Sequence, residues 1–151
     1  RSQPTSIDPH STLRGHFFPT TSPNGKMVAQ RIYQRFVIHD LESGKELVSI
    51  PWTPRGCLSN WSHDSRYVAC GSYGYGDAGE SGLMLVDVQE KRSIKLLSGD
   101  HTAPSFSPDQ RRLAVDLRTS KVPLRIRVFN LPDNLNDLWE NAVLVEDEVS
   151  E

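Results

Sequence analysis

The chain repeats one nine-residue pattern three times, as Ser22-Pro-Asn-Gly-Lys-Met-Val-Ala-Gln30, Ser62-His-Asp-Ser-Arg-Tyr-Val-Ala-Cys70 and Ser107-Pro-Asp-Gln-Arg-Arg-Leu-Ala-Val115. The three copies align without a gap and begin 40 and 45 residues apart in a chain of 151 residues. Each opens with Ser, has Asn or Asp in third place and, in two copies, Pro in second place, which is the chemistry of a type I turn. Next come a basic residue and a short apolar run, which has Ala at the same position in all three copies. Each copy therefore predicts a turn that leads into a strand.

Further apolar runs surround each turn and predict three more strands per repeat. One run precedes the turn, at residues 16–18, 58–61 and 103–106. Another follows and ends in Asp or Asn, at residues 36–40, 83–87 and 124–130. A polar turn and a last run follow in the first two repeats, at 46–50 and 93–97. Each repeat is thus interpreted as four short antiparallel strands.

A period of 40 to 45 residues with four strands per unit is typical of a β-propeller, in which each four-stranded sheet is one blade. The predicted fold is all-β, a partial β-propeller of about three blades with a short acidic C-terminal extension. We expect an N-terminal extension at 1–14, blades at about 15–52, 57–99 and 101–147, and an acidic tail at 148–151.

The segment after residue 130 departs from the repeat. Its apolar residues from Asn134 to Val145 have helical spacing, with Asp133 or Asn134 as a possible N-cap. Alternatively, residues 141–146 supply the fourth strand of the third blade. Because the repeat needs that strand, we favour a short helical turn followed by a strand from about Ala142.

Two segments resemble the WD40 family and its bacterial WD40-like relatives. The run Ile38–Leu47 is similar to that family's "W-D-x-x-T-G-K" end of the third strand, and Phe106–Asp109 is similar to its "F-S-P-D-G" turn. The family's Trp is replaced in the three repeats by His39, Val86 and Phe129. The resemblance therefore implies a divergent WD40-like propeller.

Charge and hydropathy exclude two classes of partner. The formal net charge is −2, with +5 over residues 1–130 and −7 over residues 131–151. The basic residues form no cluster of the kind that nucleic acid requires, so we expect no nucleic-acid partner. No apolar run approaches the roughly 20 residues of a membrane helix, so we expect no membrane partner. The compartment stays open, with the cytoplasm slightly favoured over export.

The sequence offers little for catalysis. Gly-x-Ser-x-Gly, His-Glu-x-x-His and Cys-x-x-Cys motifs are absent. Residues Gly74–Gly79 match Gly-x-Gly-x-x-Gly, but a predicted strand follows where a dinucleotide site needs a helix. Asp77 and Glu80 are interpreted as a solvated loop rather than a metal site. We therefore predict that the chain is not an enzyme and has no catalytic residues, no cofactor and no metal.

The two cysteines, Cys57 and Cys70, lie in the same repeat. A bridge between them is possible. Free thiols in the core are the favoured interpretation, because nothing in the sequence indicates export.

Binding is better supported than chemistry. The loops between blades, and those between second and third strands, emerge on one end of a propeller. Here they carry side chains typical of interface hot spots. These candidate partner-binding residues are Trp52, Arg55, Tyr73, Tyr75 and Asp77. The alternative is that Trp52 closes the core and that the tyrosines pack the long loop against its own blade.

The predicted function is a non-catalytic scaffold that binds a protein or peptide through this face. The alternative is a non-catalytic propeller portion of a larger enzyme, either a hydrolase gating domain or a kinase-linked sensor domain. Closed propellers have about four to eight blades. We therefore expect another chain, a second copy or further sequence to complete the ring.

Overall fold

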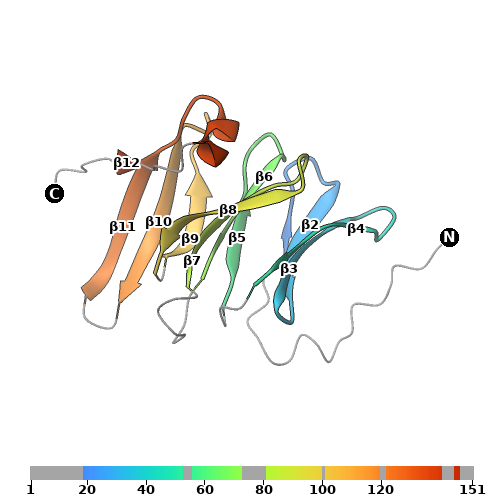
Figure 1. The fold of residues 1–151 in the computed structure, drawn as a ribbon, viewed down its shortest axis with the longest axis horizontal. Helices are drawn as coiled ribbons and strands as arrows, with labels where there is room; N and C mark the ends of the chain where they lie inside the picture. Colours follow the sequence, from blue (N-terminus) through green and yellow to red (C-terminus); the bar gives the residue numbers. More distant parts are fainter. Residues whose placement is uncertain are drawn as a thin grey trace.

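The computed structural model describes residues 19–52, 56–72, 81–99, 101–119, 122–140 and 145–146. These residues form three four-stranded antiparallel sheets that follow one another along the chain (Figure 1). Sheet 1 holds β1 (Thr20–Thr21), β2 (Met27–Ile32), β3 (Arg35–Asp40) and β4 (Glu46–Pro51). Sheet 2 holds β5 (Leu58–Trp61), β6 (Tyr67–Gly71), β7 (Gly82–Asp87) and β8 (Arg92–Ser98). Sheet 3 holds β9 (His101–Phe106), β10 (Arg112–Thr119), β11 (Val122–Asn130) and β12 (Val145–Glu146).

The sheets confirm the predicted all-β, three-bladed partial propeller. Within every sheet the strands pair in chain order, and the first strands of successive sheets contact one another. Each sheet lies inside one of the residue ranges predicted for a blade. The run at 16–18, the extension at 1–14 and the tail at 148–151 lie outside the described residues.

The repeated turns adopt one hydrogen-bond pattern in all three sheets. The first-position Ser hydroxyl donates to the third-position Asn or Asp at 2.6 Å in each turn. The same Asn or Asp oxygen accepts the fifth-position N–H at 3.0 Å in each turn. The residue at the fourth position of each turn has a left-handed backbone, with φ of +72° at Gly25, +62° at Ser65 and +61° at Gln110. The side chains therefore fix a tight turn wherever the pattern recurs.

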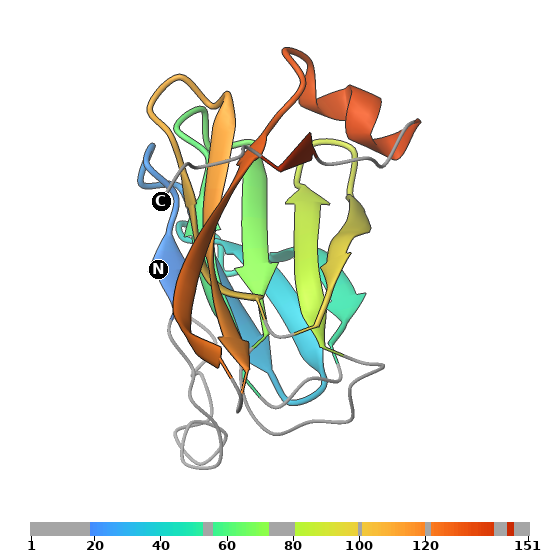
Figure 2. The same ribbon diagram turned by 90° about the vertical axis from the view of Figure 1, so that its left-hand side faces the viewer.

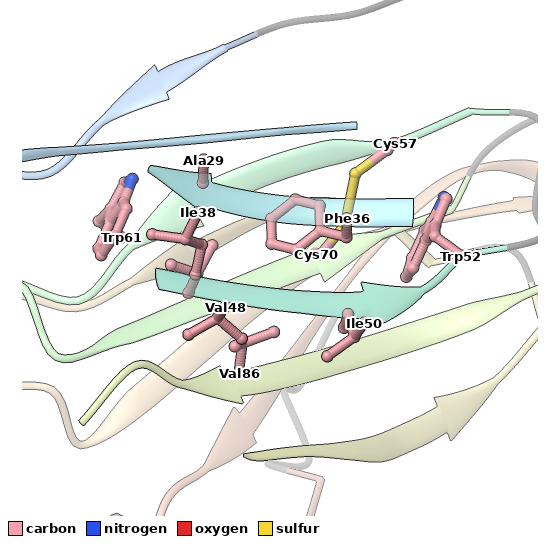
Figure 3. Close-up of a cluster of buried hydrophobic side chains, with 11 residues drawn as sticks. Ala29, Phe36, Ile38, Val48, Ile50, Trp52, Cys57, Trp61, Cys70 and Val86 are labelled. Atoms are coloured by element: carbon pink, nitrogen blue, oxygen red, sulfur yellow. A yellow bond between two sulfur atoms is a disulfide. The ribbon is translucent and has the colours of Figure 1, made fainter. Parts of the chain in front are cut away.

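Apolar side chains alternate along the strands and fill two cores, one between each pair of neighbouring sheets. The core between sheets 1 and 2 is drawn in Figure 3 and includes Phe36, Ile38, Trp61 and Val86. The core between sheets 2 and 3 includes Leu83, Leu85, Leu113 and Phe129. We call the face of a sheet that points along the chain direction, toward the position of a following sheet, its leading face. The opposite face is its trailing face.

A disulfide joins Cys57 and Cys70 in the first of these cores (Figure 3). The prediction of free thiols was therefore wrong. The two Cα atoms lie 6.3 Å apart, a separation that a disulfide spans. Cys57 precedes β5 and Cys70 lies on β6, and only the pairing of these two strands brings the sulfurs together.

The departure after residue 130 is a short 3₁₀ helix, η2 (Leu135–Trp139), followed by β12. Asn134 caps it by accepting the N–H of Asn136 at 3.1 Å, as one of the predicted caps. Leu135 and Leu138 are buried in the core between sheets 2 and 3. The predicted order of helical turn and strand is correct, and the predicted start of the strand near Ala142 lies outside the described residues.

Candidate functional site

The structure places one of the five predicted partner-binding residues, Trp52, in the core rather than on the surface. Its side chain is only 2% exposed, packs against Phe36 and donates from Nε1 to the carbonyl of Gly56 at 3.2 Å. This is the alternative interpretation, in which Trp52 closes the core. Arg55, Tyr73, Tyr75 and Asp77 lie outside the described residues.

An aromatic residue that the sequence reasoning missed lies at the same end of the molecule. Tyr33, in the turn between β2 and β3, is 64% exposed. The N–H of Trp52 donates to the carbonyl of Gln34 at 2.7 Å, so this turn adjoins the link to sheet 2. The sequence reasoning examined the loop between the second and third strands in the second repeat alone and therefore did not consider Tyr33.

A charged cluster gathers around Asp87, at the end of β7. The Asp87 side chain has no exposed surface, and its carboxylate accepts from Arg66 at 3.0 Å and from Arg92 at 3.5 Å. Asn136 of η2 joins the cluster, because its Oδ1 accepts from Arg66, Tyr67 and Arg92 at 2.9 to 3.0 Å. The cluster therefore ties η2 of the third repeat to sheet 2.

The arginines control the ionisation of this cluster. Burial raises the pKa of Asp87, but the hydrogen bonds from Arg66 and the Glu90 backbone and the charges of Arg66 and Arg92 together hold that pKa below its usual range. The hydrogen bond to Asp87 in turn raises the pKa of Arg66. The guanidinium of Arg92 also lies over the Trp139 ring, 4.3 Å from its centroid. Asp87 and Arg66 therefore stay charged near neutral pH, and the cluster acts as an anchor rather than as an acid or a base.

His101, at the start of β9, is a second buried polar group. Arg127 donates to its Nε2 at 2.9 Å, so its Nδ1 carries the proton and faces the carbonyl of Gly99 at 3.2 Å. The backbone of His101 also lies so close to β6 that a Cβ on Gly71 would collide with its carbonyl oxygen. His101 therefore has a structural role at the junction of sheets 2 and 3.

The part of the chain that the structure describes contains no group of three His, Cys, Asp or Glu residues that could hold a metal ion. It also contains no helix long and apolar enough to cross a membrane. The exposed large hydrophobic residues are a further feature of the described part of the chain. One of them, Ile126 on β11, is 63% exposed.

Comparison with known proteins places the fold. No family model and no curated protein matches the sequence. A candidate 6-phosphogluconolactonase from Bacteroides uniformis has a TM-score of 0.59 at 17% identity, over 86% of this chain and 38% of its own. The hydrazine synthase of Kuenenia stuttgartiensis has a TM-score of 0.52 at 16% identity, over 78% of this chain and 39% of its own. The fold is propeller-like. The chain spans less than two-fifths of either structure.

The comparison corrects the prediction that the chain is not an enzyme. Both similar structures bear the names of enzymes, so absence of familiar motifs does not place this fold outside enzymes. The prediction failed because short motifs are local in sequence. A propeller instead brings functional side chains together from loops of several blades.

Proposed function

We propose that these residues form a three-bladed section of the β-propeller of a larger enzyme. The observation that carries the proposal is the exposure of Ile126. Its position in sheet 3 is that of Phe36 in sheet 1 and Leu83 in sheet 2, which are 1% and 0% exposed. A sheet that still presents a core residue to water is expected to receive another element. The enzyme names of both similar structures, and the fraction of each that this chain spans, support the same proposal.

The mass of the natural gene product tests this proposal. An antibody raised against these 151 residues is expected to detect a polypeptide well above 17.0 kDa in the source cells. Peptide sequencing of that polypeptide should find further copies of the Ser-x-Asn/Asp turn and a catalytic motif such as Gly-x-Ser-x-Gly. A product of about 17 kDa would contradict the larger protein, and a product built of repeats alone would contradict its enzymatic part.

A second proposal concerns the loop end of the propeller. We propose that Arg55, Tyr73, Tyr75 and Asp77, together with Tyr33, bind a protein or peptide there. The exposed Tyr33 beside the link to sheet 2 favours this role, since tyrosine buries a large area at little entropic cost. The divergent WD40-like relationship is part of the same proposal, and no family model bears on it.

A pull-down from the source cells tests the loop end. The variants Tyr33→Ala, Arg55→Ala and Tyr75→Ala are each expected to weaken capture of a specific partner. Leu41→Ala is the matched control, because Leu41 is 47% exposed in the turn between β3 and β4, at the opposite end. Trp52→Ala is unsuitable, since it would open the core. Equal capture by all variants would remove the loop end from consideration.

A further inference from the structure

We propose that the leading face of sheet 3 is the docking surface for a fourth blade of different sequence, and not for a second copy of this chain. This inference rests on the proposed function, because the fourth blade belongs to the larger polypeptide. It identifies which of the two end faces continues the propeller and what the incoming blade must carry. The argument uses the repeat register, the turn hydrogen bonds and the burial of both end faces.

The register shows that the leading face of sheet 3 carries apolar residues at the positions that are buried in sheets 1 and 2, with Asp116 paired opposite Ile126. Ala29 pairs with Ile38 in sheet 1, and Ala69 pairs with Leu85 at the equivalent position of sheet 2. All four residues are buried between sheets. The same pairing in sheet 3 joins Ala114 to Val128. With Ile126, these residues present a small and two β-branched apolar side chains on a face that no described element covers, at the end of the stack in Figures 1 and 2.

The backbone N–H at the third position of turns 1 and 2 donates to the next turn along the chain. The third-position N–H of turn 1, on Asn24, donates to the Ser65 hydroxyl of turn 2 at 3.0 Å. The third-position N–H of turn 2, on Asp64, donates to the Gln110 side chain of turn 3 at 2.8 Å. The fourth-position side chain of each turn thus receives the N–H of the turn before it.

The equivalent donor in turn 3 is the N–H of Asp109. It makes no hydrogen bond to another described residue, and by analogy with the N–H groups of Asn24 and Asp64 it is expected to face the next blade. A fourth blade with Ser, Gln or a similar acceptor at its fourth turn position would continue the series. The first strands of sheets 2 and 3 end in Trp61 and Phe106, which fill the junction with the previous sheet. The incoming blade is expected to carry an aromatic residue there.

A second copy of this chain does not meet these requirements. Its first blade would have to dock, and its fourth turn position is Gly25, which has no side chain to accept the Asp109 N–H. At the ends of the first strands, Thr21 replaces Trp61 and Phe106, and it is exposed. Val37 and Gln30, at the centre of the trailing face of sheet 1, are already buried within the chain. The trailing face of sheet 1 is therefore less open to a docking blade than the face that exposes Ile126.

Thiol labelling tests the docking surface directly. Ile126→Cys is introduced into the 151-residue chain and into the full natural polypeptide, and the rate of modification by a maleimide is measured. The unsubstituted chain is the blank, since both of its cysteines form the disulfide. Leu41→Cys is the exposed control. Ala114→Cys is a smaller change on the same face and guards against misfolding of the first variant.

The expected result is fast labelling of Ile126→Cys in the 151-residue chain at every protein concentration, and labelling slower by about tenfold or more in the full polypeptide. Leu41→Cys should label equally fast in both. Protection of the isolated chain that grows with concentration would show that a second copy covers the face, and would overturn the proposal. Equally fast labelling in a full polypeptide that is larger than this chain would also overturn it while leaving the proposed function intact. A natural product of 17 kDa would instead defeat the proposed function.

Discussion

Gly25 shows how one residue sets the geometry of a repeated turn. It occupies the left-handed position that Ser65 and Gln110 share, with a φ of +72°, and a Cβ placed on it would have nothing within 4 Å. Ser65 and Gln110 accept the backbone strain of that position and gain hydrogen bonds to the preceding turn. Gly25 makes no such bond, so its role is conformational alone.

This difference predicts the effect of substitution at Gly25. Gly25→Val is expected to lower the free energy of unfolding by about 1–2 kcal/mol, because a β-branched residue is strained at positive φ. Gly25→Asn should cost much less, since Asn tolerates the left-handed region. Urea unfolding of the three proteins measures the difference. Equal losses for Val and Asn would show that strain is not the cause.

Asp87 is the charged residue on which the sheet 2 cluster depends. Asp87→Asn is expected to destabilise the fold by about 2–4 kcal/mol at pH 7, because two partly buried arginines lose their counter-charge. Asp133→Asn is the matched control, since the Asp133 pair with Arg111 is exposed at 3.9 Å and should contribute less than about 1 kcal/mol.

The same carboxylate predicts a pH dependence. The pKa of Asp87 is lower in the folded chain than in the unfolded one, so its contribution is complete above the unfolded pKa of about 3.9 and is lost as the pH falls through the folded pKa. The stability difference between the natural chain and Asp87→Asn should therefore shrink below about pH 4. Thermal unfolding from pH 7 to pH 3 measures it. A difference that stays constant would contradict the ion pair.

Elements are joined to one another by the turn hydrogen bonds as well as by the cores. Gln110 links sheet 3 to sheet 2 through both ends of its amide, because Oε1 accepts from the Asp64 N–H and Nε2 donates to Asp64 Oδ2 at 3.2 Å. Burial raises the pKa of Asp64, but hydrogen bonds from Ser62, the Arg66 backbone and Gln110 together hold it below its usual range.

Gln110→Glu places a second carboxylate beside Asp64. It is expected to lower stability by about 0.5–1.5 kcal/mol at pH 7 through the lost hydrogen bond and the new repulsion. The loss should diminish toward pH 4 as the new carboxyl binds a proton. Gln89→Glu adds the same charge in the exposed turn between β7 and β8 and is the control. Chemical unfolding at both pH values provides the measurement, and a loss equal to that of Gln89→Glu would contradict the link.

The whole molecule is a stack of sheets with two unlike ends. The trailing face of sheet 1 has polar Gln30 and His39 at positions where sheet 3 has Val115 and Phe129. The leading face of sheet 3 instead exposes Ile126. The two end faces therefore differ in exposure, because Ile126 of sheet 3 lies open while Val37 and Gln30 of sheet 1 are buried.

This asymmetry predicts how the isolated chain behaves. Ile126→Lys should reduce the binding of an apolar dye and the light scattering of concentrated solutions, because it replaces the exposed apolar side chain of this face with a charged one. It should change stability by less than about 0.5 kcal/mol, as expected for an exposed site. Leu41→Lys is the control, since it adds the same charge away from the sheet faces. A loss of several kcal/mol for Ile126→Lys would mean that the face is already packed.

The sequence by itself determined the number of sheets, the strand order and the turns, because Ser-x-Asx chemistry and the alternation of apolar residues act over a few neighbours. It also located η2 through the spacing of Leu135 and Leu138 and the Asn134 cap. These features are local, and the turn and strand patterns occur in each of the three repeats.

Only the tertiary structure decided which residues meet between sheets. Trp52 entered the core, Cys57 reached Cys70 through strand pairing, and Asn136 reached Arg66 from a segment 70 residues away. The exposure of Ile126 likewise depends on the absence of a following sheet among the described residues. Such contacts follow from register and stacking, which no local pattern encodes, and they carry both the anchor at Asp87 and the proposed docking surface.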